Sequence, residues 1–150
     1  MLLELIVVMV MMGIFMAIVG QTLFQSHQSL NLDTVVQKMI SDIKNQQMHA
    51  MQADTVILGQ YVDFSVYFEA NKYVLFSGLV YDPSNTTNIE MRIDAPISLS
   101  FIGVPQSTIS FSRLSGDVRS FTIGQDTIIV ANSQTTETQT VRINKRGVLF

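Results

Sequence analysis

The sequence predicts an α+β fold in which one long N-terminal helix packs on an antiparallel β-sheet domain. Residues 1–20 form an apolar run that contains a single charged residue, Glu4. No proline occurs before Pro83, and apolar residues recur at helical spacing beyond position 32. From position 56 onward, short runs of β-branched and aromatic residues alternate with turn residues. We therefore expect a helical part at 1–53 and a β-sheet domain at 54–150.

The first twenty residues have the length and composition of a membrane-spanning helix. A helix of this size is roughly 30 Å long, which matches the hydrocarbon core of a bilayer. Gly13 and Gly20 each weaken the helix by about 1 kcal/mol relative to alanine, so they mark positions where it could bend. A carboxylate costs about 3 kcal/mol at the centre of such a helix and less near an end, so Glu4 is a candidate functional residue that needs a partner. The nearest cation is the amino group of Met1.

The second half of the helix is predicted to be amphipathic. Its apolar stripe consists of Leu32, Val36, Met39, Ile43 and Ala50, flanked by Val35, Ile40 and Met51. This stripe should pack on the chain's own sheet. Lys38 and Asp42 are four residues apart and are expected to pair on the helix surface. The whole helix is predicted to run from about residue 2 to about residue 53, on the order of 75 Å.

Closely spaced short strands predict antiparallel pairing in the remainder of the chain. The expected strands cover residues 56–58, 62–68, 73–76, 89–93, 97–102, 108–111, 120–123, 127–130, 138–143 and 147–150. Glu69–Lys72 has the composition of a tight hairpin turn. The first clear hairpin should therefore join the second and third of these strands.

Composition limits the chemistry that the chain can carry. Charged residues make up 14% of the sequence, against about 25% in typical soluble domains. There is no cysteine, so the chain has no disulfide, no thiolate nucleophile and no cysteine-ligated metal. The net charge of −3 gives no broad basic field for nucleic acid. No glycine-rich phosphate loop, HExxH zinc helix or GxSxG elbow occurs, so we expect neither an enzyme nor a cofactor.

The segment Leu2-Leu3-Glu4-Leu5, followed by an aliphatic run with Gly13, resembles the amino terminus of mature type IV pilins and type II secretion pseudopilins. Those chains usually begin Phe-Thr-Leu-Ile-Glu-Leu, after a prepilin peptidase removes a leader and methylates the new amine. Further patterns resemble the H-type minor pseudopilins. They are Asn45–Ala50, Val66–Phe68, Tyr73–Phe76, Ile109–Gly116 and Val141–Gly147. The resemblance implies the pilin fold, with the long helix packed on the sheet.

The resemblance also implies a function. It indicates a structural subunit that polymerises through its N-terminal helix into a type IV pilus-like filament. In that family the acid corresponding to Glu4 neutralises the amine of an adjacent subunit, here Met1. The implied partners are copies of the chain, an inner-membrane assembly platform, a prepilin peptidase and the membrane itself. Subunits would reside in the inner membrane before assembly and at the cell surface in the filament.

Two alternatives remain open at this point. One is a low-copy minor pilin or pseudopilin of a type II secretion or DNA-uptake system, which the H-type patterns favour. The other is a single-pass membrane-anchored binding domain, for which an apolar N-terminal helix serves only as an anchor.

Three further groups of residues are candidates for binding, and in each case a plain surface role is favoured. Arg142, Lys145 and Arg146 form a basic cluster that could contact phosphates, but no aromatic residue is interleaved with them, so a nucleic-acid partner is not expected. His27 and His49 lie too far apart on one helix to share a metal ion. The loop residues Asp82, Asn85, Asn88 and Glu90 carry the oxygen atoms that Ca²⁺ prefers, but an ordinary polar loop is favoured.

Overall fold

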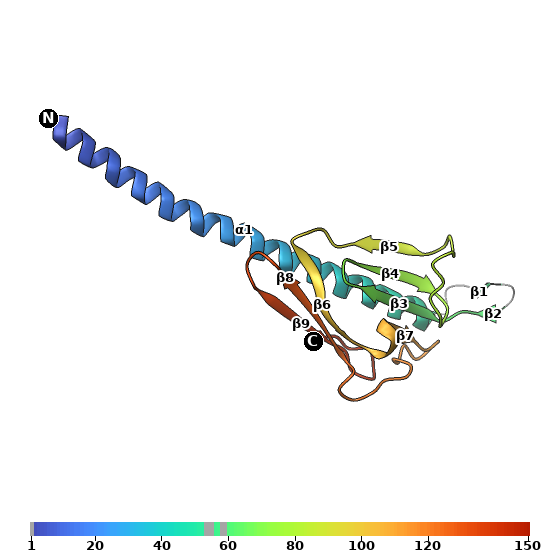
Figure 1. Cartoon of the computed structure of the whole chain (residues 1–150). Helices are drawn as coiled ribbons and strands as arrows, with labels where there is room; N and C mark the ends of the chain where they lie inside the picture. Colours follow the sequence, from blue (N-terminus) through green and yellow to red (C-terminus); the bar gives the residue numbers. More distant parts are fainter. Residues whose placement is uncertain (1, 53–55, 58–59) are drawn as a thin grey trace.

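The computed structural model describes the backbone of residues 2–52, 56–57 and 60–150 and the side chains of residues 6–16, 32–52 and 62–150. Within them, helix α1 (Leu2–Gln52) is followed by β-strands, which confirms the α+β class (Figure 1). The strands are β1 (Val56–Ile57), β2 (Gln60–Tyr61), β3 (Phe64–Glu69), β4 (Lys72–Ser77), β5 (Ile89–Arg92), β6 (Ile97–Gly103), β7 (Thr108–Phe111), β8 (Thr127–Asn132) and β9 (Thr138–Arg142). A short 3₁₀ helix, Pro105–Ser107, precedes β7.

Helix α1 is continuous through Gly13 and Gly20 and ends at Gln52, close to the expected boundary. Its C-terminal half lies against the sheets, whereas its N-terminal half projects away from them (Figure 1). Within the described residues, no helix is both long and apolar enough to cross a membrane.

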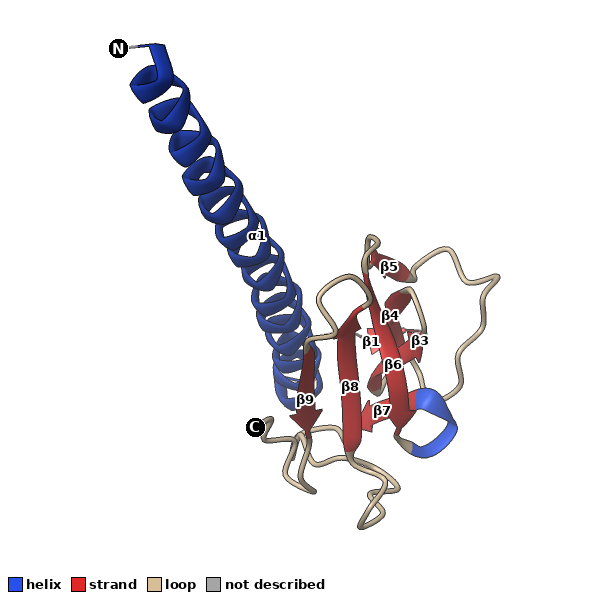
Figure 2. Cartoon of the chain, turned by 60° about the vertical axis from the view of Figure 1, so that its left-hand side comes forward, coloured by secondary structure: helices blue, strands red, loops and turns tan. Residues whose placement is uncertain are grey.

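All the strand pairs in the described residues are antiparallel, as predicted. One sheet has the order β5-β4-β3-β7, a second has the order β6-β8-β9, and β1 pairs with β2. Glu69 pairs with Lys72 across a two-residue turn, so the predicted hairpin is confirmed. That turn also joins the two sheets, because the carbonyl of Ala70 accepts a hydrogen bond of 2.7 Å from the amide of Leu99 in β6. Figure 2 shows α1 lying along one side of the strands.

Two predicted strands, 120–123 and 147–150, are wrong. Residues 120–123 form only an isolated bridge, between Thr122 and Gln125, because Ser120 and Gly124 have φ values of 53° and 84° and bend the chain out of the extended conformation. Residues 147–150 begin with a turn at Gly147, and the remainder folds back on the end of β9. The amide of Phe150 donates to the carbonyl of Arg142 at 3.0 Å.

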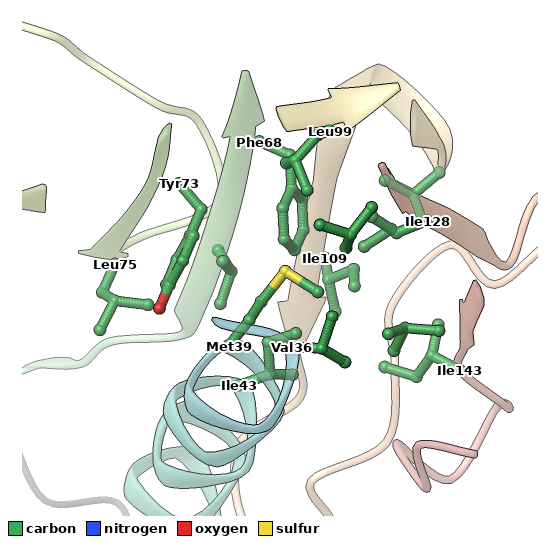
Figure 3. Packing of buried hydrophobic residues seen from close by; sticks show 14 of the residues in the cluster. Val36, Met39, Ile43, Phe68, Tyr73, Leu75, Leu99, Ile109, Ile128 and Ile143 are labelled. Carbon is green, nitrogen blue, oxygen red and sulfur yellow. The ribbon is translucent and has the colours of Figure 1, made fainter. Parts of the chain in front are cut away.

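The core lies between the C-terminal half of α1 and the two sheets, and it confirms the predicted stripe. Leu32, Val36, Met39, Ile43 and Ala50 are each no more than 3% exposed. Their spacing brings them to one side of the helix, because residues three and four apart lie on the same face. Figure 3 shows Met39 pointing from the helix toward Phe68 of β3, with Ile109 of β7 and Ile128 of β8 nearby. Both sheets are therefore held to the same face of α1.

Candidate assembly surface

Residues 6–16 of α1 form a segment, here called the apolar segment, that is exposed in the single chain. Ten of its residues are large and hydrophobic, and their exposed fractions lie between 49% and 74%. They are Ile6, Val7, Val8, Met9, Val10, Met11, Met12, Ile14, Phe15 and Met16. The eleventh residue, Gly13, has no atom within 4 Å of the place where a Cβ would lie. Nothing in the described chain covers this segment.

The exposure extends around the whole circumference of the helix. Eleven residues make about three helical turns, so every direction around the axis is represented. A helix that is hydrophobic on all sides is normally buried in a larger assembly or in lipid. The apolar segment is therefore the candidate site of association among the described residues.

The C-terminal half of α1 has a different surface. Its exposed residues are the polar Asp33, Thr34, Gln37, Lys38, Ser41, Lys44, Asn45 and Gln52, together with Met48 and Met51 near its C-terminal end. The opposite side is the buried stripe described above. The described parts of the helix therefore comprise an apolar segment followed by a segment with one apolar and one polar face.

Three side-chain contacts fix the C-terminal half of α1 to the sheet domain. Asp33 accepts a hydrogen bond from the Nε2 of Gln139 in β9. Asp42 accepts a bond of 2.6 Å from the hydroxyl of Tyr73 in β4. Burial raises the pKa of the Tyr73 hydroxyl, and the bond to Asp42 raises it further, so this group stays a neutral donor.

The third contact is made by Gln47, which sequence analysis did not single out. Its Nε2 donates to the carbonyl of Gly116 at 2.9 Å and to that of Arg146 at 2.8 Å. Gly116 and Gly147 leave room for this side chain. A Cβ at Gly147 would lie 2.3 Å from the amide nitrogen of Gln47, and φ is +74° there. One amide group thereby joins the helix to two loops that are distant in sequence.

We expect Gln47→Ala to lower the free energy of unfolding by about 1–3 kcal/mol, because two carbonyl groups lose their donor. Chemical denaturation followed by circular dichroism would measure this change. Gln37→Ala is the matched control, since Gln37 is exposed on the same helix and should change the stability by less than about 0.5 kcal/mol. Equal effects from the two substitutions would contradict the assigned role of Gln47.

The predicted surface pair of Lys38 with Asp42 does not form in the described residues. Asp42 is instead the acceptor for Tyr73. A hydrogen bond to a charged group contributes about 1.5–3 kcal/mol, whereas an i,i+4 pair on a helix surface contributes only about 0.3–0.5 kcal/mol. Asp42 therefore binds Tyr73 of the sheet in place of Lys38 on its own helix.

The residues proposed for assembly lie at the N-terminal end of α1. Met1 lies outside the described residues, and Glu4 is part of the helix while its side chain lies outside the described set. The backbone is helical at both Gly13 and Gly20, so the bending expected there stays a prediction.

The basic cluster at the end of the chain is only partly available to a partner. Arg142 forms an ion pair with Asp126 at 3.1 Å, and its guanidinium lies over the ring of Phe150, 5.9 Å from the centroid. Lys145 and Arg146 are exposed in the turn after β9. One of the three charges is therefore already offset within the domain.

Arg142→Ala is expected to destabilise the domain by about 1–2 kcal/mol. Asp126 is only 8% exposed, so its carboxylate would lose its cation in a poorly hydrated position. The effect is limited because half of the Arg142 side chain is exposed to solvent, which weakens its attraction to Asp126. Thermal unfolding would measure the effect. Lys145→Ala serves as a control that should leave the melting temperature unchanged, and an equal loss from both would argue against the ion pair.

The remaining candidates do not form a metal site among the described residues. The ring of His49 stacks on Phe64 with centroids 5.6 Å apart, while the side chain of His27 lies outside the described set. In the predicted loop, Asp82 accepts hydrogen bonds from Ser84, and these lower the pKa of the carboxyl group. No group of three or more acidic or histidine side chains in the described chain is arranged to bind a metal ion.

Comparison of the chain with protein-family models, with curated proteins and with solved structures finds no match in any of the three.

Proposed function

We propose that this chain is a pilin-like structural subunit that polymerises through its N-terminal helix into a type IV pilus-like filament. The observation that carries the proposal is the apolar segment. Its ten large hydrophobic side chains are at least 49% exposed and extend from a helix whose other half is fixed to a folded domain. The resemblance of the first residues to mature pilins supports the same function.

Copies of the same helix are the partner that best fits this segment. A helix that is apolar on all sides needs neighbours on all sides, and parallel copies displaced along an axis supply them. Such contacts are heterologous and do not close, so they produce a fibre instead of a ring. Burying one large apolar side chain contributes about 1.5–3 kcal/mol, so ten of them can offset an association cost of about 4–15 kcal/mol.

Glu4 would set the register between neighbouring subunits. Its carboxylate would pair with the amine of Met1 on an adjacent copy, surrounded by apolar side chains. Attraction between charges is stronger in such a medium, and an unpaired carboxylate is correspondingly costly. A subunit docked in the wrong register would bury Glu4 without a cation, so the charge selects one position along the helix.

The proposal carries expectations about partners and location. Unassembled subunits would be held at the inner membrane, where an assembly platform and a prepilin peptidase act on them, and assembled subunits would be at the cell surface. Electron microscopy with labelled antibody on surface-sheared material from the source cell tests this. Labelled fibres are the expected result. Fibres that lack this chain would contradict its role as the major subunit.

A further inference from the structure

The loop between β4 and β5, residues 78–88, is held in shape by its own polar groups. The carbonyl of Asp82 accepts hydrogen bonds from the amide of Asn85 at 3.2 Å and from the Nδ2 of Asn88 at 2.7 Å. The carboxylate of Asp82 accepts two more, from the amide and the hydroxyl of Ser84. In Figure 2 the loop extends from the side of the strands opposite α1. It is therefore a surface loop whose side chains have defined positions.

Within this loop, Asn85, Thr86 and Thr87 form the sequence Asn-x-Thr, the acceptor sequence for N-linked glycosylation. Of the seven asparagines in the chain, Asn85 is the only one with a serine or threonine two positions later. All three residues are exposed, as an acceptor must be if an enzyme is to reach it. A three-residue pattern occurs often by chance, so the arrangement of the side chains decides whether the site is suitable.

The side chain of Asn85 presents its nitrogen to solvent and binds through its oxygen. Its Oδ1 accepts hydrogen bonds from the amide of Thr87 at 3.0 Å and from the hydroxyl of Thr87 at 2.8 Å. Its Nδ2 makes no hydrogen bond within the part of the chain that the structure describes. Donors at Oδ1 stabilise the negative charge that this oxygen gains when Nδ2 gives up a proton. In the same loop, the Nδ2 of Asn88 is already bound to Asp82.

We propose that Asn85 is an N-glycosylation site. The donor class is a glycan carried on a lipid phosphate. The Nδ2 of Asn85 attacks the anomeric carbon of the glycan, so a C–N bond forms while the bond from that carbon to the phosphate oxygen breaks. The lipid phosphate leaves with the electron pair of that bond, and a base of the transferase takes one proton from Nδ2. No atom is oxidised or reduced.

The position of the loop makes a glycan compatible with assembly. Because α1 and the loop lie on opposite sides of the strands, copies of α1 packed at a filament axis would leave the loop facing outward (Figure 2). A bulky, hydrated sugar would then lie at the filament surface and not between helices. This inference rests on the proposed function, since the transfer requires the sheet domain to lie outside the cytoplasm.

The test uses the full chain purified from source cells, both from sheared filaments and from the membrane pool. Trypsin releases residues 73–92 as one peptide, which contains Asn85 and Asn88. Tandem mass spectrometry that preserves the sugar linkage should find a glycan on Asn85 and none on Asn88. An unmodified Asn85 in both pools would overturn the inference, and so would a glycan on Asn88.

Substitutions within the loop test the acceptor sequence itself. Asn85→Gln and Thr87→Ala should abolish the glycosylated peptide, because the first removes the acceptor and the second removes the hydroxyl that binds its oxygen. Thr87→Ser keeps a hydroxyl and should keep the glycan. Thr86→Ala is the matched control, since it makes the same change at the middle position, and it should also keep the glycan. Equal glycosylation of Thr86→Ala and Thr87→Ala would overturn the assignment.

The failures of the two proposals are distinguishable. Filaments that contain the chain with an unmodified Asn85 would overturn this inference and leave the proposed function intact. A chain glycosylated at Asn85 in cells whose filaments lack it would overturn the proposed function and support the modification site. A chain that is unmodified and absent from filaments would overturn both.

Discussion

Deletion of residues 2–24 is expected to abolish filament formation while the remaining chain still folds. The deletion removes the whole apolar segment, which is the surface proposed to pack between subunits. It removes no residue of the described core, which begins at Leu32. Electron microscopy of sheared material would measure assembly, and circular dichroism with thermal unfolding would measure the fold. Filaments built from the truncated chain would contradict the proposed function.

A pair of single substitutions gives the same test without a deletion. Val10 lies within the apolar segment and is 57% exposed, and Gln37 is exposed on the polar half of the same helix. Val10→Asp introduces a charge where neighbouring helices would pack, so we expect filament yield to fall to background. Gln37→Asp introduces the same charge into a polar surface and should assemble normally. The deletion of residues 2–24 also separates the proposed function from the alternative of a single-pass membrane-anchored binding domain. Such a domain acts alone, so it would retain its binding activity after the deletion.

Glu4→Ala is expected to reduce the yield of sheared filaments to near background while the pool of unassembled subunit is unchanged or larger. If the proposed pair forms, the substitution removes the partner of the amine on an adjacent copy, and that amine would then be buried without an anion. Losing one member of a buried ion pair typically costs about 3–5 kcal/mol, or more than a hundredfold in an equilibrium constant. Quantitative immunoblotting of the sheared and cell-bound fractions measures the ratio.

The substitution Glu4→Gln distinguishes charge from polarity at this position. The amide keeps the shape and part of the hydrogen bonding of glutamate but carries no charge. It should behave like Glu4→Ala if the ion pair sets the register, and like the natural chain if a polar group is sufficient. Glu137→Ala, in an exposed loop of the sheet domain, is the control and should leave assembly unchanged. A normal filament yield from Glu4→Ala would disprove the role of this residue.

The features that were predicted correctly are set by residues close together in the sequence. The buried stripe from Leu32 to Ala50 follows the helical period, and the hairpin turn between Glu69 and Lys72 has the composition of a turn. The prediction of a strand at 120–123 was wrong because a short run of β-forming residues forms a strand only where a second strand lies beside it. Ile123 is 91% exposed, and the backbone turns on either side of it at Ser120 and Gly124.

The contacts that were not predicted join residues far apart in the chain. Asp42 and Tyr73 are 31 residues apart, and Gln47 is 99 residues from Arg146. No local sequence pattern predicts either contact, because each depends on which strand or loop the fold places beside the helix. For the assembly surface, hydrophobicity alone indicated residues 1–20, whereas the structure adds that residues 6–16 are uncovered on all sides.

The attachment of α1 to the sheet domain determines how a filament subunit would respond to tension. The buried stripe and the three side-chain contacts are distributed along residues 32–50, about 27 Å of helix. A pull along the helix axis would slide this length past both sheets, so the contacts would be loaded together in shear. A pull perpendicular to the axis would open them one after another from one end. The domain should therefore detach from its helix at a much higher force along the fibre than across it.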